Sequence, residues 1–157
     1  MHVFKYLALL LLICLTLSFS TALAAPAPSA KDKCPVCGMF VGKYPDWVAG
    51  VTFKDSTALY FDGAKDLFTY YHNIKKYSPL KNQAAISAIT VNDYYSLKPV
   101  DARQALFVLG SDVYGPMGKE LVPFGKEADA QAFLRDHKGR KVLRFNDVTP
   151  AILKSME

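Results

Sequence analysis

Cysteine and histidine are scarce in this chain, which limits the metal sites and catalytic groups that it can build. Its 157 residues include three cysteines and three histidines. His72 and His137 stand alone, so the second Cys or His pair that completes most structural zinc sites is absent. We expect a surface or packing role for His72, and for His137 a favourable interaction with the dipole of the helix that it ends. No Ser/His/Asp triad, phosphate-binding loop or pair of catalytic carboxylates can be recognised, so we expect a protein that is not an enzyme.

The chain also lacks a basic stripe. It has 19 Lys and Arg residues against 14 Asp and Glu residues, a formal net charge of +5. The densest basic spots are the pairs Lys75-Lys76 and Arg140-Lys141, and the other charges are scattered. Nucleic-acid-binding proteins instead gather basic side chains on one face. We therefore expect no nucleic-acid partner.

The first 24 residues have the composition of a secretory signal peptide. Lys5 gives the segment a positive start, residues 7–17 are apolar, and Ala-Leu-Ala ends it as a small-residue cleavage site. Cleavage would remove one of the 19 basic residues and none of the 14 acidic ones. The sequence therefore predicts export to the periplasm, with residues 25–33 as a flexible lead-in rich in alanine and proline.

A lipid anchor has less support in the sequence. Cys14 lies inside the apolar run, and a lipobox would place a small residue where Ile13 stands. We therefore expect contact with the membrane through partner proteins, with lipidation of Cys14 as the alternative.

Residues 34–157 predict one α+β domain of two related halves, at about 34–80 and 85–150. The expected elements are strands at 48–54 and 57–61, a helix from about Gly63, strands at 87–95, 104–109 and 120–124, a helix at 126–137 and a strand at 141–145. Asp62 is the expected N-cap of the first helix, and residues 110–118 the expected turn-rich loop. Each half contains a ββα unit, which predicts antiparallel sheets with helices packed on one face.

The segment Cys-Pro-Val-Cys-Gly-Met at residues 34–39 brings two thiols and a thioether together. These soft sulfur donors favour Cu(I) over hard cations. Covalent haem would need histidine where the chain has Gly38. A thioredoxin-like motif would follow a strand, and none is expected before Cys34. Cu(I) is the expected ligand, while thiol–disulfide exchange by Cys34 and Cys37, or a structural disulfide between them, remains the alternative.

Two methionines have positions that suit a copper site. Met39 lies two residues after Cys37, so both would point to the same side of an extended segment. Met117 stands in the expected loop, where no periodic pattern explains an apolar side chain. The alternative is that both methionines only cover apolar surface.

Four segments together resemble the NosL family, whose members are accessory factors of nitrous oxide reductase. They are Cys-Gly-Met-Phe-Val at 37–41, Leu-Tyr-Phe-Asp at 59–62, Gly-Pro-Met-Gly at 115–118 and the tail at 128–145. YHS-type metal-binding modules, an alternative, also begin with a CGM-like segment. The Gly-Pro-Met-Gly loop and the two-half layout separate this chain from those shorter domains.

The resemblance implies a periplasmic Cu(I) metallochaperone for the copper centre of nitrous oxide reductase, and so a role in denitrification. It implies nitrous oxide reductase and its membrane maturation complex as partners, and a fold similar to that of the organomercurial lyase. By motif match, the copper ligands fall on Cys37, Met39 and Met117. Cys34 is a further candidate, as a ligand or as a resolving thiol. Many family members are lipoproteins, whereas this leader shows no clear lipobox.

Overall fold

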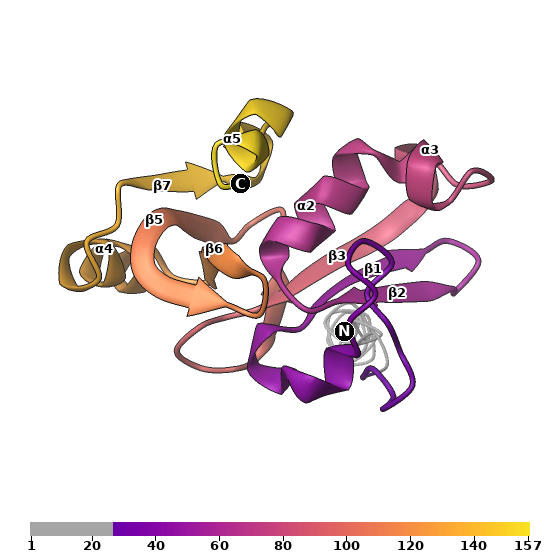
Figure 1. The fold of residues 1–157 in the computed structure, drawn as a ribbon, viewed down its shortest axis with the longest axis horizontal. Coiled ribbons are helices and arrows are strands. Elements are labelled where there is room, and N and C mark those ends of the chain that lie inside the picture. The colour runs from indigo at the N-terminus through magenta and orange to yellow at the C-terminus, as the bar shows by residue number, and fades with distance from the viewer. Residues whose placement is uncertain (1–26) are drawn as a thin grey trace, which may run out of the picture.

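The computed structural model describes residues 27–157 (Figure 1). The expected signal peptide at 1–24, with Cys14 inside it, lies outside the described residues. Within residues 27–157, no helix combines the length and the apolar composition that crossing a membrane requires.

The first half forms a four-stranded antiparallel sheet in the order β2-β1-β3-β4. Its strands are β1 (Ala49–Phe53), β2 (Ala58–Phe61), β3 (Ile86–Asn92) and β4 (Pro99–Asp101). Helix α2 (Ala64–His72) follows β2 almost directly, and the short α3 (Ile74–Tyr77) comes after it. Strand β3 lies in the range expected for the second half, yet it pairs with β1.

The second half repeats this arrangement in a three-stranded antiparallel sheet of order β6-β5-β7. Its elements are β5 (Leu106–Gly115), β6 (Gly118–Phe124), α4 (Glu127–Asp136) and β7 (Lys141–Arg144). In both halves the first strand is flanked by the second strand and by the strand that follows the helix. The predicted α+β fold of two related halves is confirmed, and each unit is ββαβ.

Short helical turns complete the chain. They are the 3-10 helices η1 (Val41–Lys43), η2 (Pro45–Trp47), η3 (Gln83–Ala85) and η4 (Phe145–Asp147), and the helix α5 (Pro150–Lys154). Thr149 is the N-cap residue of α5, and its hydroxyl accepts a hydrogen bond from the backbone N–H of Ile152. This helix was not predicted from the sequence.

Helix α2 joins the two halves of the molecule, because it packs on β1 and β2 and also on β6 (Figure 1). Its side chains Leu67, Phe68 and Tyr70 are fully buried. The Phe68 ring meets Phe107 of β5 edge-on, with ring centroids 5.0 Å apart. Each such side chain contributes about 1.5–3 kcal/mol through burial. The start of α2 is therefore held between elements of both halves.

The segment 110–118, expected to be a loop, is a β-hairpin. Strand β5 continues to Gly115, which pairs with Gly118 around a two-residue turn that contains Met117. The polar residues and glycines of this segment are typical of loops. The strand tolerates them because its pairing with β6 is irregular midway along the hairpin.

Candidate metal centre

The two cysteines lie on a tight turn that precedes the first strand. The backbone N–H of Cys34 donates to Met39 O at 2.8 Å, and that of Gly38 donates to Cys34 O at 2.9 Å. Gly38 has a φ of 80°, a left-handed conformation that glycine adopts without strain. The expectation that this segment is extended is therefore wrong, because it forms a turn.

The corner between β2 and α2 carries two aspartates. Asp62 directly follows β2, and Asp66 lies in the first turn of α2. Gly63 is the N-cap residue, so the prediction of Asp62 as the N-cap is wrong. The Asp62 carboxylate instead accepts a hydrogen bond from the thiol of Cys37, with Sγ and Oδ1 3.2 Å apart.

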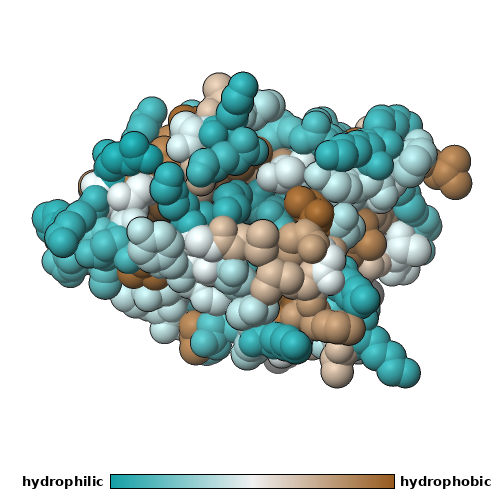
Figure 2. Space-filling model, viewed as in Figure 1, coloured by the Kyte–Doolittle hydropathy of each residue, from teal (hydrophilic) through white to brown (hydrophobic). Residues whose placement is uncertain are grey.

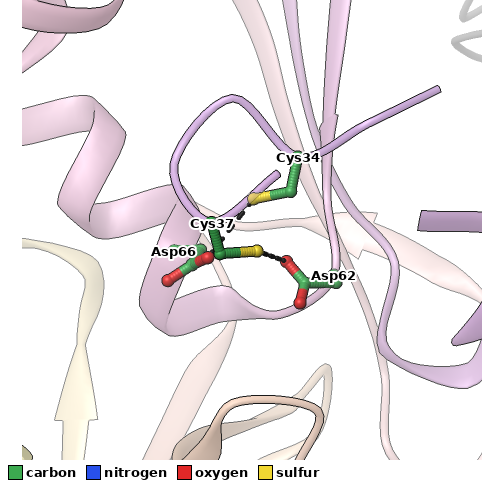
Figure 3. Close-up of side chains that lie close together, drawn as sticks. All are labelled: Cys34, Cys37, Asp62 and Asp66. Carbon is green, nitrogen blue, oxygen red and sulfur yellow. Dashed lines mark hydrogen bonds between the residues drawn. The ribbon is translucent and has the colours of Figure 1, made fainter. Parts of the chain in front are cut away.

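Four donor atoms meet between the cysteine turn and this corner (Figure 3). One ligand atom from each of Cys34, Cys37, Asp62 and Asp66 lies within 4.8 Å of all the others. The Cys34 thiol donates to Asp66 Oδ2 at 3.3 Å, and within the described residues both cysteines are free. We call these four side chains the thiol–carboxylate cluster. Thiolates and carboxylates both bind metals, so a cation can replace the two thiol protons.

Burial governs the electrostatics of the cluster. Cys34, Asp62 and Asp66 are buried and Cys37 is half-buried. Loss of solvent raises the pKa of Cys37 to about 12, and the two aspartates add to this rise. Burial likewise raises the pKa of Cys34 far above its ordinary value, and it raises the pKa of Asp66. Both thiols therefore carry their protons at neutral pH.

One buried oxygen of the cluster has no partner. Asp62 is 1% exposed, and its Oδ2 atom forms no hydrogen bond. Leaving a buried polar group unsatisfied costs about 1–3 kcal/mol, and more for a charged one. Native proteins keep few such groups, and a bound ion is one of the explanations for them. The Asp62 carboxylate thus keeps one unpaired oxygen while its other oxygen binds the Cys37 thiol, which indicates a candidate cation site.

The two predicted methionine ligands lie in different surroundings. Met39 is half-buried at the end of the cysteine turn, whereas Met117 is 45% exposed at the tip of the β5–β6 hairpin. Lys65 Nζ donates to Met117 O at 2.9 Å, which ties the hairpin tip to the first turn of α2. Ligation by either thioether stays a prediction.

The histidines are engaged elsewhere. His72 Nε2 lies 2.6 Å from Val148 O. His137 is the C-cap residue of α4, and its ring stacks on Phe133 while Nδ1 lies 3.1 Å from Asp112 Oδ1. Neither imidazole belongs to the thiol–carboxylate cluster.

The sequence motif identifies the two thiols of the cluster but not its two carboxylates. Asp62 was assigned to helix capping, and Asp66 was given no role. A signal for them exists, because Asp62 directly precedes the N-cap of the helix and Asp66 lies in its first turn, so both stand at the same helix end. Two acidic side chains in that arrangement, next to a segment that carries soft ligands, could have been proposed as a pair.

An α+β domain of two ββαβ halves, with a largely buried thiol–carboxylate cluster at the start of α2, defines a small protein with a candidate metal site. The sequence model of the NosL family matches residues 25–153. The chain therefore belongs to the NosL family, and the resemblance seen in its motifs is confirmed.

Two relatives show how far the similarity extends. The copper-binding lipoprotein NosL of Stutzerimonas stutzeri is 29% identical over 131 residues, which cover 78% of this chain and 65% of that protein. The match thus spans less than two thirds of the relative. The crystal structure of the copper chaperone NosL from Shewanella denitrificans has a TM-score of 0.70 at 26% identity, covering 82% of this chain and 97% of that one. The names of both relatives refer to copper.

Proposed function

We propose that this protein is an exported Cu(I) metallochaperone that carries copper at the thiol–carboxylate cluster. The observation that carries the proposal is the buried, unpaired Asp62 Oδ2 atom beside two free thiols. Cys34 and Cys37 supply soft sulfur, which Cu(I) prefers to oxygen. Met39 and Met117 supply thioethers, which need no deprotonation to bind. A chaperone of this kind binds its cargo and catalyses no reaction.

The cluster suits release as well as binding. Copper binds thiolates, so each thiol gives up its proton when the metal enters. Asp66 and Asp62 accept hydrogen bonds from those same protons, which stabilises the copper-free protein. This stabilisation weakens copper binding relative to that of two isolated thiolates. Copper can then pass to an acceptor that binds it more tightly.

The acceptor in this proposal is the copper centre of nitrous oxide reductase, reached with the membrane maturation complex during denitrification. Membership of the NosL family supports it. The signal-like composition of residues 1–24 supports a periplasmic location. The relative from Stutzerimonas stutzeri is named a lipoprotein. That name favours an anchor, but Ile13 stands where a lipobox has a small residue, so contact with the membrane is proposed through partner proteins, with an anchor at Cys14 as the alternative.

Thiol–disulfide exchange has less support from the geometry. Reactive cysteines have lowered pKa values in electropositive surroundings. Here carboxylates face both thiols, and burial raises the pKa of Cys37 to about 12. The thiolate that exchange requires is therefore scarce at neutral pH.

The carboxylates favour a second candidate ligand, a divalent cation such as Zn(II). Two thiolates and two carboxylates provide the four donors of a tetrahedral zinc site. Anaerobic titration of the reduced protein with Cu(I) and with Zn(II), each against a chelator of known affinity, separates the two. We expect one tightly bound Cu(I) per chain and weak Zn(II) binding. Tight Zn(II) binding with no preference for Cu(I) would overturn the copper proposal.

Delivery needs its own experiment. Cu(I)-loaded protein is mixed with copper-free nitrous oxide reductase, the two are separated, and the metal on each is measured over time. We expect the reductase to gain copper faster than from the same concentration of Cu(I) bound to glutathione. Equal rates would exclude direct delivery and leave copper binding intact.

A further inference from the structure

We propose that Lys65 and Glu120 are a positioning pair that fixes the Met117 turn to the first turn of α2. The second half of the chain thereby presents a thioether to a metal bound by the first half. This inference rests on the proposed copper site. The turn lies at the tip of the β5–β6 hairpin, where Met117 is 45% exposed. Figure 2 shows an area of apolar colour near the centre of the face in view.

Glu120 joins strand β6 to the start of α2. Its side chain is buried at 3% exposure. Oε1 accepts hydrogen bonds from the backbone N–H of Lys65 at 2.6 Å and of Leu121 at 2.8 Å. The first bond satisfies a free N–H group at the helix start, as a capping side chain would. The cap that Asp62 does not provide therefore comes from the other half of the molecule.

Two glycines make room for this carboxyl group. A Cβ atom on Gly63 would overlap Glu120 Oε2, and one on Gly115 would lie 2.9 Å from Glu120 Cγ. Gly63 belongs to the corner of the first half, and Gly115 begins the Gly-Pro-Met-Gly segment of the hairpin. The space that holds the Glu120 side chain is therefore bounded both by the corner between β2 and α2 and by the hairpin that carries Met117.

Lys65 makes the second connection. Its backbone N–H donates to Glu120 and its ammonium donates to Met117 O at 2.9 Å. It lies between Asp62 and Asp66 in the chain, so its position and theirs are coupled. The Met117 side chain is 45% exposed, so packing alone does little to fix it. The bond to its carbonyl supplies the missing restraint.

A double-mutant cycle tests the pair. Cu(I) affinity is measured for Lys65→Met, for Met117→Leu and for the two changes together. We expect Lys65→Met to weaken binding about threefold to tenfold in the parent and to have no effect once Met117 is Leu. The matched control is Lys75→Met, because the Lys75 ammonium also donates to a backbone carbonyl, that of Pro79, at 3.1 Å. We expect the control to change nothing.

X-ray absorption of the Cu(I)-loaded proteins gives a readout that a purely structural role would not move. We expect Lys65→Met to lose one sulfur neighbour of copper at an unchanged melting temperature. In a Glu120→Gln background, which keeps the acceptor oxygen, we expect Met117→Leu still to weaken Cu(I) binding. In a Glu120→Asp background, whose side chain is shorter, we expect Met117→Leu to leave Cu(I) binding unchanged.

The outcomes of these measurements separate the positioning role from the proposed copper site. An equal loss from Lys65→Met in both backgrounds would show an effect of charge alone and overturn the positioning role. An unchanged affinity in Met117→Leu, with binding still lost in Cys37→Ser, would also overturn it and leave the copper site standing. Binding that survives Cys37→Ser would overturn the proposed function itself.

Discussion

The corner between β2 and α2 and the corner between β6 and α4 are built alike, yet only the first holds thiols. Each follows a fully buried phenylalanine that ends a strand, Phe61 or Phe124. Each helix carries an aspartate at its third residue, Asp66 in α2 and Asp129 in α4. Asp66 is buried against Cys34, whereas Asp129 is partly exposed to solvent.

The segments that cover the two corners explain the difference. The first corner is covered by the cysteine turn. The second is covered by the loop after β3, in which Asp93 accepts hydrogen bonds from the backbone N–H of Ser96 and of Gly125, both at 2.7 Å. Both oxygens of Asp93 are used in this way, whereas Asp62 keeps one unpaired. The repeated unit thus supplies a helix start with an acid, and the cysteine turn that covers the first one makes it a candidate metal site.

The largest change in Cu(I) affinity is expected when the first corner loses a thiol and the second corner is altered as a control. Cys37→Ser should weaken Cu(I) binding about 100-fold or more, because a serine hydroxyl is a hard donor and stays protonated. Cys34→Ser should weaken it less, because the family motif places Cys37 at the metal. Ser96→Ala, at the second corner, should leave it unchanged. Anaerobic competition against a Cu(I) chelator measures all three, and full affinity in Cys37→Ser would move the site elsewhere.

The thiols of the first corner should also make Cu(I) affinity depend on pH. The pKa of Cys37 is raised to about 12, so its thiol must lose a proton when copper binds. Cu(I) affinity should therefore rise with pH, by about tenfold per pH unit for each proton displaced. Chelator competition between about pH 6 and pH 8 gives the slope, and Cys34→Ser should lower it. A flat profile would mean that the thiolates exist before copper arrives.

The aspartates at equivalent positions of the two helices, Asp66 and Asp129, allow a further test. Asp66→Asn should tighten Cu(I) binding about threefold to tenfold, because it removes a negative charge beside a thiolate and lowers the thiol pKa. The same change should weaken Zn(II) binding, since it removes an oxygen ligand. Asp129→Asn should alter neither affinity. Weaker Cu(I) binding by Asp66→Asn would identify this carboxylate as a copper ligand.

The last prediction concerns the stability of the fold and not copper affinity. Gly63→Ala should lower the free energy of unfolding by about 1–3 kcal/mol, because the added Cβ overlaps the Glu120 carboxyl group. Gly125→Ala should cost less, since its Cβ would come no nearer than 3.1 Å to another atom, Val100 Cγ1. Urea unfolding of both variants checks this. Equal losses would show that Glu120 is not held tightly at the first corner.

Local pattern was enough to predict most of the fold. Alternating apolar residues near 48–54 and helical spacing at Leu67, Phe68 and Tyr71 are signals carried by neighbouring residues. The β5–β6 hairpin was missed because its stability comes from pairing across the turn, while its own residues favour a loop. The three-residue strand β4 is too short to show a period.

The candidate site could be predicted only in part, for the same reason. Cys34 and Cys37 are recognisable from a six-residue motif. Asp62 lies 25 residues from Cys37, and Asp66 lies 32 residues from Cys34. Their contacts with the thiols depend on how the cysteine turn packs on the corner between β2 and α2. The role proposed for Glu120 depends on a still longer contact, 55 residues from Lys65.

Glu120 also makes the joint between the halves a proton-binding site. Burial raises its pKa from 4.5 to about 8, so the folded protein holds a proton there that the unfolded chain releases. Oε1 accepts both backbone hydrogen bonds, which leaves Oε2 to carry that proton. By linkage, this group's contribution to stability is complete below about pH 4.5 and is lost as the pH rises through about 8. Alkaline conditions therefore loosen the connection between the halves while they free the thiols for metal.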